Sequence, residues 1–120
     1  MPIFDPATLQ TFRTRQEVAI RTAQHPEPPV VIWIVVSGSE VFIRSVRGAK
    51  GRWYKDLSAG GPAVIEIDGQ RIDVVAIPAA DAASVQRASR EYLAKYAASP
   101  YAQAMVKPEV LPTTLRLEPR

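Results

Sequence analysis

The residues best suited to do chemistry in this sequence are basic, and they crowd into one short segment. Between Arg44 and Asp56 there are five Lys or Arg residues and one acid, so the segment carries a net charge of 5 − 1 = +4. The whole chain carries only +3, which leaves −1 for all other residues. Gly48 and Gly51 interrupt the basic residues and let the backbone turn so that its amides converge. This pattern is typical of a loop that binds a phosphate or a carboxylate, although a solvated basic loop has the same composition.

An aromatic pair, Trp53-Tyr54, follows the basic loop directly. A flat ring could be held against this pair, because aromatic faces stack on one another. The alternative is that Trp53 packs on the fold and closes one end of it. Trp33 lies in the most apolar run of the chain and is expected in the core.

The other side chains offer little chemistry of their own. The chain has no cysteine and a single histidine, which excludes a disulfide scaffold, a thiol nucleophile and a zinc site built from Cys and His. The histidine, His25, lies among prolines and is expected at the surface. Neither a Walker-type phosphate loop nor a Gly-x-Ser-x-Gly elbow is present. Enzymatic chemistry would therefore come from a bound cofactor, and we expect no metal site.

The elements that must position the basic loop are mainly short strands. Alternating or β-branched runs predict six of them, at residues 17–22, 30–36, 40–46, 63–68, 71–77 and 113–117. The run 30–36 is expected to be a central strand buried on both faces. Turn residues at 37–39 and at Asp68-Gly69 predict two hairpins. Helices are expected to start at Pro6, to span 53–57 and 81–96, and to occupy part of 99–108.

Short antiparallel strands in this number curl into a barrel or a sandwich. We predict a mainly β fold, a small barrel with peripheral helices, as a single domain over residues 1–120. The longest apolar run has seven residues, far fewer than the roughly 20 that a membrane-spanning helix needs. The first residues do not resemble a secretory signal, so we expect a cytoplasmic protein with no membrane partner.

The segment from Glu40 to Leu57, EVFIRSVRGAKGRWYKDL, resembles the signature of an uncharacterised bacterial domain family. The similarity continues through 92–96 and 114–119, so it covers nearly the whole chain. That family is in turn similar to the flavin- and deazaflavin-binding split β-barrels. The resemblance implies a six-stranded antiparallel split β-barrel that forms homodimers with the cofactor at the interface.

A more distant similarity is to the deazaflavin-dependent nitroreductases, in which a strand end and the following loop hold the cofactor phosphate and its acidic tail. The shared residues are Ser45, Gly48, Trp53-Tyr54 and Leu57. The similarity implies that the phosphate contacts here are Ser45, Arg47, Gly48 and Lys50, with Arg44 as a further candidate. Trp53 and Tyr54 would pack beside the cofactor or support its loop. In that group N-terminal residues cover the substrate, so with one small helix here we expect a reduced cover or one supplied by a partner subunit.

The leading hypothesis is thus a cofactor-binding split barrel, an oxidoreductase that uses a deazaflavin or FMN on a substrate the sequence does not identify. Its partner would be a small anionic cofactor. One alternative is a small basic barrel that binds single-stranded nucleic acid. Nucleic acid is the less favoured partner, because the basic residues form one loop and not a stripe. The other alternative is a non-catalytic interaction module.

Overall fold

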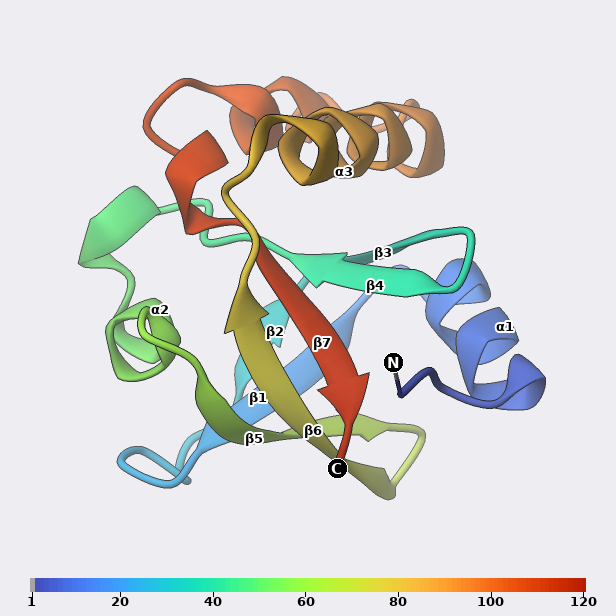
Figure 1. Ribbon diagram of the computed structural model, residues 1–120, viewed down its shortest axis with the longest axis vertical. Helices are drawn as coiled ribbons and strands as arrows, with labels where there is room; N and C mark the ends of the chain where they lie inside the picture. The colour runs from blue at the N-terminus through green and yellow to red at the C-terminus, as the bar shows by residue number, and fades with distance from the viewer. Residues whose placement is uncertain (1) are drawn as a thin grey trace.

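The computed structural model describes residues 2–120, which form one antiparallel sheet that curls into a nearly closed barrel (Figure 1). The sheet has seven strands in the order β2-β1-β5-β6-β7-β4-β3. Their bounds are β1 Val18–Thr22, β2 Val30–Ile32, β3 Ile34–Ser37, β4 Glu40–Ile43, β5 Gly61–Ile67, β6 Gln70–Pro78 and β7 Leu115–Pro119. The mainly β, barrel-like architecture is confirmed, but the prediction of six strands is wrong.

The extra strand arises because the apolar run 30–36 is divided at Trp33. β2 pairs with β1, whereas β3 pairs with β4, so these consecutive strands lie at opposite ends of the sheet. Burial on both faces holds for β3 but not for β2, where Val30 and Val31 are exposed. The uniform run of β-branched residues favours strand throughout and gives no signal for the change of partner. We call the junction between β2 and β3 at Trp33 the seam.

Three α-helices surround the barrel: α1 (Pro6–Thr14), α2 (Arg52–Leu57) and α3 (Ala82–Lys95). The first and third begin as predicted, because Asp5 accepts a hydrogen bond from the Thr8 amide at 2.7 Å and Asp81 caps α3 in the same way. Three short 3-10 turns also form: η1 (Gly48–Lys50), η2 (Ala102–Val106) and η3 (Leu111–Thr113). Within residues 2–120, no helix is both long and apolar enough to cross a bilayer.

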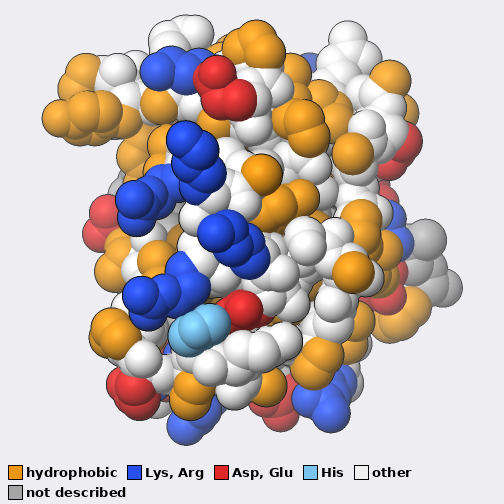
Figure 2. Space-filling view, turned by 90° about the vertical axis from the view of Figure 1, so that its left-hand side faces the viewer, with side chains coloured by type: hydrophobic (Ala, Val, Ile, Leu, Met, Phe, Trp, Pro, Cys, Tyr) orange, Lys and Arg blue, Asp and Glu red, His pale blue; other side chains and the backbone are white. Residues whose placement is uncertain are grey.

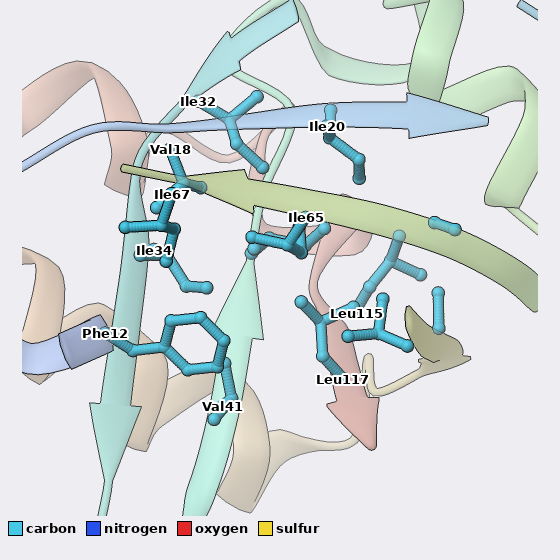
Figure 3. Close-up of a cluster of buried hydrophobic side chains, with 14 of the residues drawn as sticks. Phe12, Val18, Ile20, Ile32, Ile34, Val41, Ile65, Ile67, Leu115 and Leu117 are labelled. Atoms are coloured by element: carbon cyan, nitrogen blue, oxygen red, sulfur yellow. The ribbon is translucent and has the colours of Figure 1, made fainter. Parts of the chain in front are cut away.

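The barrel interior is filled by alternate residues of the strands, whose side chains point toward one another in Figure 3. Phe12 of α1 closes one end of this core and is fully buried. Burying each large aliphatic or aromatic side chain contributes about 1.5–3 kcal/mol, so the interior supplies most of the driving force for closure. The core includes Val18, Ile20, Ile32, Ile34, Val41, Ile65, Ile67, Leu115 and Leu117.

A second apolar cluster lies outside the barrel. It lies between α3 and the strands β3 and β4, which α3 covers on the outside of the barrel in Figure 1. Val35 and Phe42 point outward from the sheet and pack with Tyr92 and Tyr96 of α3. This packing explains why β3 and β4 are buried on both faces. The two predicted hairpins are confirmed, and both residues of the Asp68-Gly69 turn have positive φ, at 52° and 79°.

Candidate functional site

A cleft of about 600 Å³ lies at the seam of the barrel. Its walls come from β1 and β2, Trp33, the segment that follows β4, the start of α2, and η2 with the residue before it. Most of the lining is apolar, with Ile20, Val30, Val31, Ile32, Val46, Tyr101 and Met105. A volume of this size accommodates a small organic ligand, and predominantly apolar walls are usual for such sites.

Both tryptophans of the chain line this cleft. Trp33 is partly buried, and its ring stacks on Tyr96 with centroids 3.9 Å apart and planes 3° apart. The Tyr96 hydroxyl donates to the carbonyl of Gln16 at 2.6 Å, which holds the stack in place. The expectation that Trp33 belongs to the core is therefore only partly correct, because one side of it faces the cleft. Trp53 is buried, packs edge-on against Tyr54, and contributes to both the core and the cleft wall.

The basic loop after β4 is shaped by Ser45 and two glycines. The Gly48 amide donates to the Ser45 carbonyl at 2.9 Å, and the Ser45 hydroxyl donates to the Gly48 carbonyl at 2.8 Å. Gly48 has a φ of +66°, and a Cβ there would lie 3.2 Å from the carbonyl oxygen of Glu109. Glycine is required at this position for both reasons. Ser45 and Gly48 thus shape the loop that carries Arg47.

Arg44 is buried below the cleft, with only 1% of its surface exposed. Its guanidinium donates to Thr114 Oγ1 at 2.8 Å and to the carbonyls of Met105 and Val85 at 3.0 and 2.8 Å. No carboxylate of residues 2–120 forms an ion pair with it, and burial lowers the pKa of the guanidinium. Arg44 therefore joins β4 to α3, η2 and Thr114 while adding an unneutralised positive charge to the cleft.

The structure brings together some of the seven predicted site residues and separates others. Arg44, Ser45, Arg47 and Trp53 line the cleft, whereas Gly48, Lys50 and Tyr54 do not. Arg52, which was predicted only as part of the basic segment, also lines it. Arg47 and Arg52 are exposed, and neither forms an ion pair with a carboxylate of residues 2–120. Figure 2 shows Lys and Arg side chains gathered on one face of the molecule, with the histidine beside them.

His25 is the lining residue that sequence reasoning missed. Its Nδ1 lies 2.7 Å from Oδ2 of Asp56, a residue 31 positions further along the chain and mostly buried. The only signal in the sequence was that His25 is the single histidine. Residues 2–120 contain no cluster of three or more His, Cys, Asp or Glu side chains that could hold a metal ion.

These observations define the class of structure: it is a nearly closed antiparallel barrel with an apolar cleft at its seam, bordered by arginines. The chain belongs to the family described as "uncharacterized protein conserved in bacteria" (DUF2255), whose model matches residues 8–117. The fold is similar to the crystal structure of the conserved hypothetical protein Rv2991 from Mycobacterium tuberculosis, with a TM-score of 0.65 and 12% sequence identity. That similarity covers 99% of this chain and 82% of the other, and at such identity it shows the fold alone. No curated protein matches the sequence.

Proposed function

We propose that the cleft binds a flat aromatic cofactor with an anionic tail, either a deazaflavin coenzyme or FMN, and that the protein is an oxidoreductase of the split-barrel type. The observation that carries the proposal is the combination of two tryptophans and unpaired arginines in one apolar cleft of about 600 Å³. Isoalloxazine and deazaflavin rings are planar and largely apolar, so they suit walls formed by Trp33, Trp53 and Ile32. The substrate of the reaction stays undefined.

The charges in and around the cleft support an anionic ligand. Arg47 and Arg52 are free to form charge-assisted hydrogen bonds, and guanidinium groups match the geometry of a phosphate. Arg44 adds a buried positive charge that no carboxylate of residues 2–120 pairs with. The buried charge of Arg44 is screened little, and the exposed Arg47 and Arg52 can contact a ligand directly, which favours a ligand with a phosphate or an acidic tail.

A homodimer is part of the proposal, since split barrels commonly place their cofactor between two subunits. Val31, Val46 and Tyr101 line the cleft and are exposed by 61%, 56% and 71%. A second subunit would cover these apolar side chains and complete the cover of the cofactor. Analytical ultracentrifugation of wild-type protein tests this part, and a strictly monomeric protein at high micromolar concentration would contradict it.

The two tryptophans provide a direct binding assay, because both line the cleft. Titration with FMN and, separately, with a deazaflavin coenzyme should quench the intrinsic fluorescence in a saturable way. Arg47→Ala should weaken binding roughly 10- to 100-fold, since a hydrogen bond to a charged group contributes about 1.5–3 kcal/mol. Arg90→Ala is the matched control, because Arg90 is exposed on α3 and does not line the cleft.

Absence of quenching by both cofactors at high micromolar concentration would contradict the proposal. A single-stranded oligonucleotide in the same assay tests the alternative partner. Quenching by the oligonucleotide that declines steeply as salt rises would favour nucleic-acid binding, because phosphate contacts release counterions.

A further inference from the structure

Two side chains, those of Thr22 and His25, contact one carboxylate oxygen of Asp56 beside the cleft. Oδ2 of Asp56, on α2, accepts a hydrogen bond from Thr22 Oγ1 at 2.7 Å and lies 2.7 Å from His25 Nδ1. The His25 backbone amide donates to the same Thr22 oxygen at 3.1 Å. Thr22 ends β1, and His25 lies in the loop that leads from β1 to β2. The imidazole is therefore held both through its own backbone and through its ring.

The loop that carries His25 is fixed from its other side as well. Arg21 Nη1 donates to the carbonyl of Pro26 at 2.6 Å, and Arg21 Nε lies 3.1 Å from Glu66 on β5. Arg21 also pairs with Glu27 of the loop. These contacts hold the loop, and with it the backbone of His25, against β1 and β5.

The environment of the Asp56 carboxylate determines which imidazole nitrogen carries hydrogen. Burial raises the pKa of this carboxyl group, but the hydrogen bonds from His25 and Thr22 outweigh burial, and its pKa lies below the usual value. Asp56 is therefore an ionised acceptor, which requires a hydrogen on Nδ1 of His25. The nearby charge of Arg52 on α2 also lowers the pKa of Asp56 and favours the carboxylate form.

This arrangement leaves Nε2 of His25 without a partner in residues 2–120, on a ring that lines the cleft and is 45% exposed. A histidine in a cleft wall whose Nδ1 is oriented by a mostly buried carboxylate and whose Nε2 is unpaired has the arrangement of a general acid and base. This pair could not be predicted from the sequence, because its members are 31 positions apart in the chain.

We propose that His25 is the proton-transfer residue of the cleft and that Asp56, supported by Thr22, is its positioning residue. The proposal rests on the proposed function, because it needs a ligand in the cleft. A bound reduced flavin or deazaflavin would supply a hydride to one atom of an activated double bond. The adjacent atom must then gain a proton, and the Nε2–H bond of the His25 imidazolium breaks to provide it. The neutral ring recovers a proton from solvent, which its exposure allows.

The free protein provides the first test, because a single histidine gives a single set of imidazole nitrogen resonances. Long-range nitrogen–proton NMR of wild-type protein, at a pH where the ring is neutral, should show the form with hydrogen on Nδ1. Asp56→Asn should lose this preference, since its amide can donate to the ring instead. A wild-type ring with hydrogen on Nε2 would overturn the proposal.

The second test uses FMN as the probe. Saturating FMN should shift the Nε2 resonance, and the pH dependence of the midpoint potential of bound FMN should include an inflection that depends on the His25 imidazole. His25→Gln should bind FMN and remove this inflection, because a glutamine amide can still donate to Asp56 but cannot titrate. Arg90→Ala should behave as wild type in both measurements.

Failure of the acid–base proposal can be distinguished from failure of the proposed cofactor binding. If FMN binds but neither the Nε2 resonance nor the pH dependence of its potential involves His25, the acid–base proposal is overturned and cofactor binding stands. If neither FMN nor a deazaflavin binds to wild-type protein, both proposals are overturned.

Discussion

Gly51 and Ser45 are packed so closely in the cleft wall that a methyl group on Gly51 would clash with one atom, the hydroxyl oxygen of Ser45. Gly51 has φ −59° and ψ 132°, which any residue adopts, so Gly51→Ala introduces no backbone strain. A Cβ at this position would overlap the Ser45 hydroxyl oxygen, whereas it would lie 3.5 Å from Ser45 Cβ, an ordinary contact. The hydroxyl can avoid the methyl group only by leaving the Gly48 carbonyl, to which it donates at 2.8 Å.

This geometry predicts strong coupling between two substitutions. Gly51→Ala should lower the free energy of unfolding by about 1–3 kcal/mol, the usual cost of overpacking. Ser45→Ala should lower it by about 1 kcal/mol, because one hydrogen bond is lost. The double variant no longer contains the atom that clashes, so its stability should be close to that of Ser45→Ala alone. The expected coupling free energy is therefore about 1–3 kcal/mol in favour of the double variant, equal to the cost of Gly51→Ala alone.

Equilibrium urea unfolding, followed by tryptophan fluorescence, measures all four proteins under one condition. The two tryptophans report on the cleft region itself, since both line it. The packing argument would be refuted if the losses in free energy of unfolding of the two single variants summed to the loss in the double variant within about 0.5 kcal/mol. They would show that the Ser45 hydroxyl does not hold the loop in the way its contacts with Gly48 and Gly51 indicate.

Two further predictions concern buried cations. Arg44→Met should lower the free energy of unfolding, measured in urea, by about 3 kcal/mol, because three buried acceptors lose their donor. Thr114→Val should lower it by only about 1 kcal/mol. Equal effects of the two substitutions would contradict this prediction. Burial lowers the pKa of Lys95 from 10.5 to about 8, so above pH 8 the folded chain releases a proton that the unfolded chain retains. Stability should rise toward pH 10, by at most about 1 kcal/mol per pH unit, and then fall as the unfolded chain ionises Tyr92 and Tyr96, whose pKa values burial raises. Lys95→Met should abolish the rise in a urea titration repeated across this pH range, and a rise that persists would assign it to another group.

Local features of the fold were predictable from the sequence because their causes are local. Asp5 and Asp81 begin helices where they were expected, and Asp68-Gly69 forms its hairpin, since capping and turn geometry depend on a few neighbouring residues. The division of residues 30–36 into two strands at Trp33 was not predictable. It follows from closure of the whole sheet, and no residue type within this apolar run indicates it.

The candidate site shows the same limit. Arg47 and Trp53, both expected as cofactor contacts from the basic segment and the aromatic pair after it, line the cleft. Arg44 was expected as a further phosphate contact, yet three acceptors supplied by distant segments allow it to be buried. The contact between His25 and Asp56 joins residues 31 positions apart, and only the packing of α2 against β1 creates it.

The position of β7 between β6 and β4 determines when the barrel can form during synthesis. β4 and β6 are translated early, but each needs a partner that is supplied by residues 115–119. Until that segment leaves the ribosome, the sheet consists of a four-stranded part, β2-β1-β5-β6, and the separate hairpin of β3 and β4. The apolar faces of both parts stay accessible to solvent and to chaperones during that time. A chain that stops before Leu115 therefore leaves β4 and β6 each without one partner and presents the unpaired edges of an open sheet.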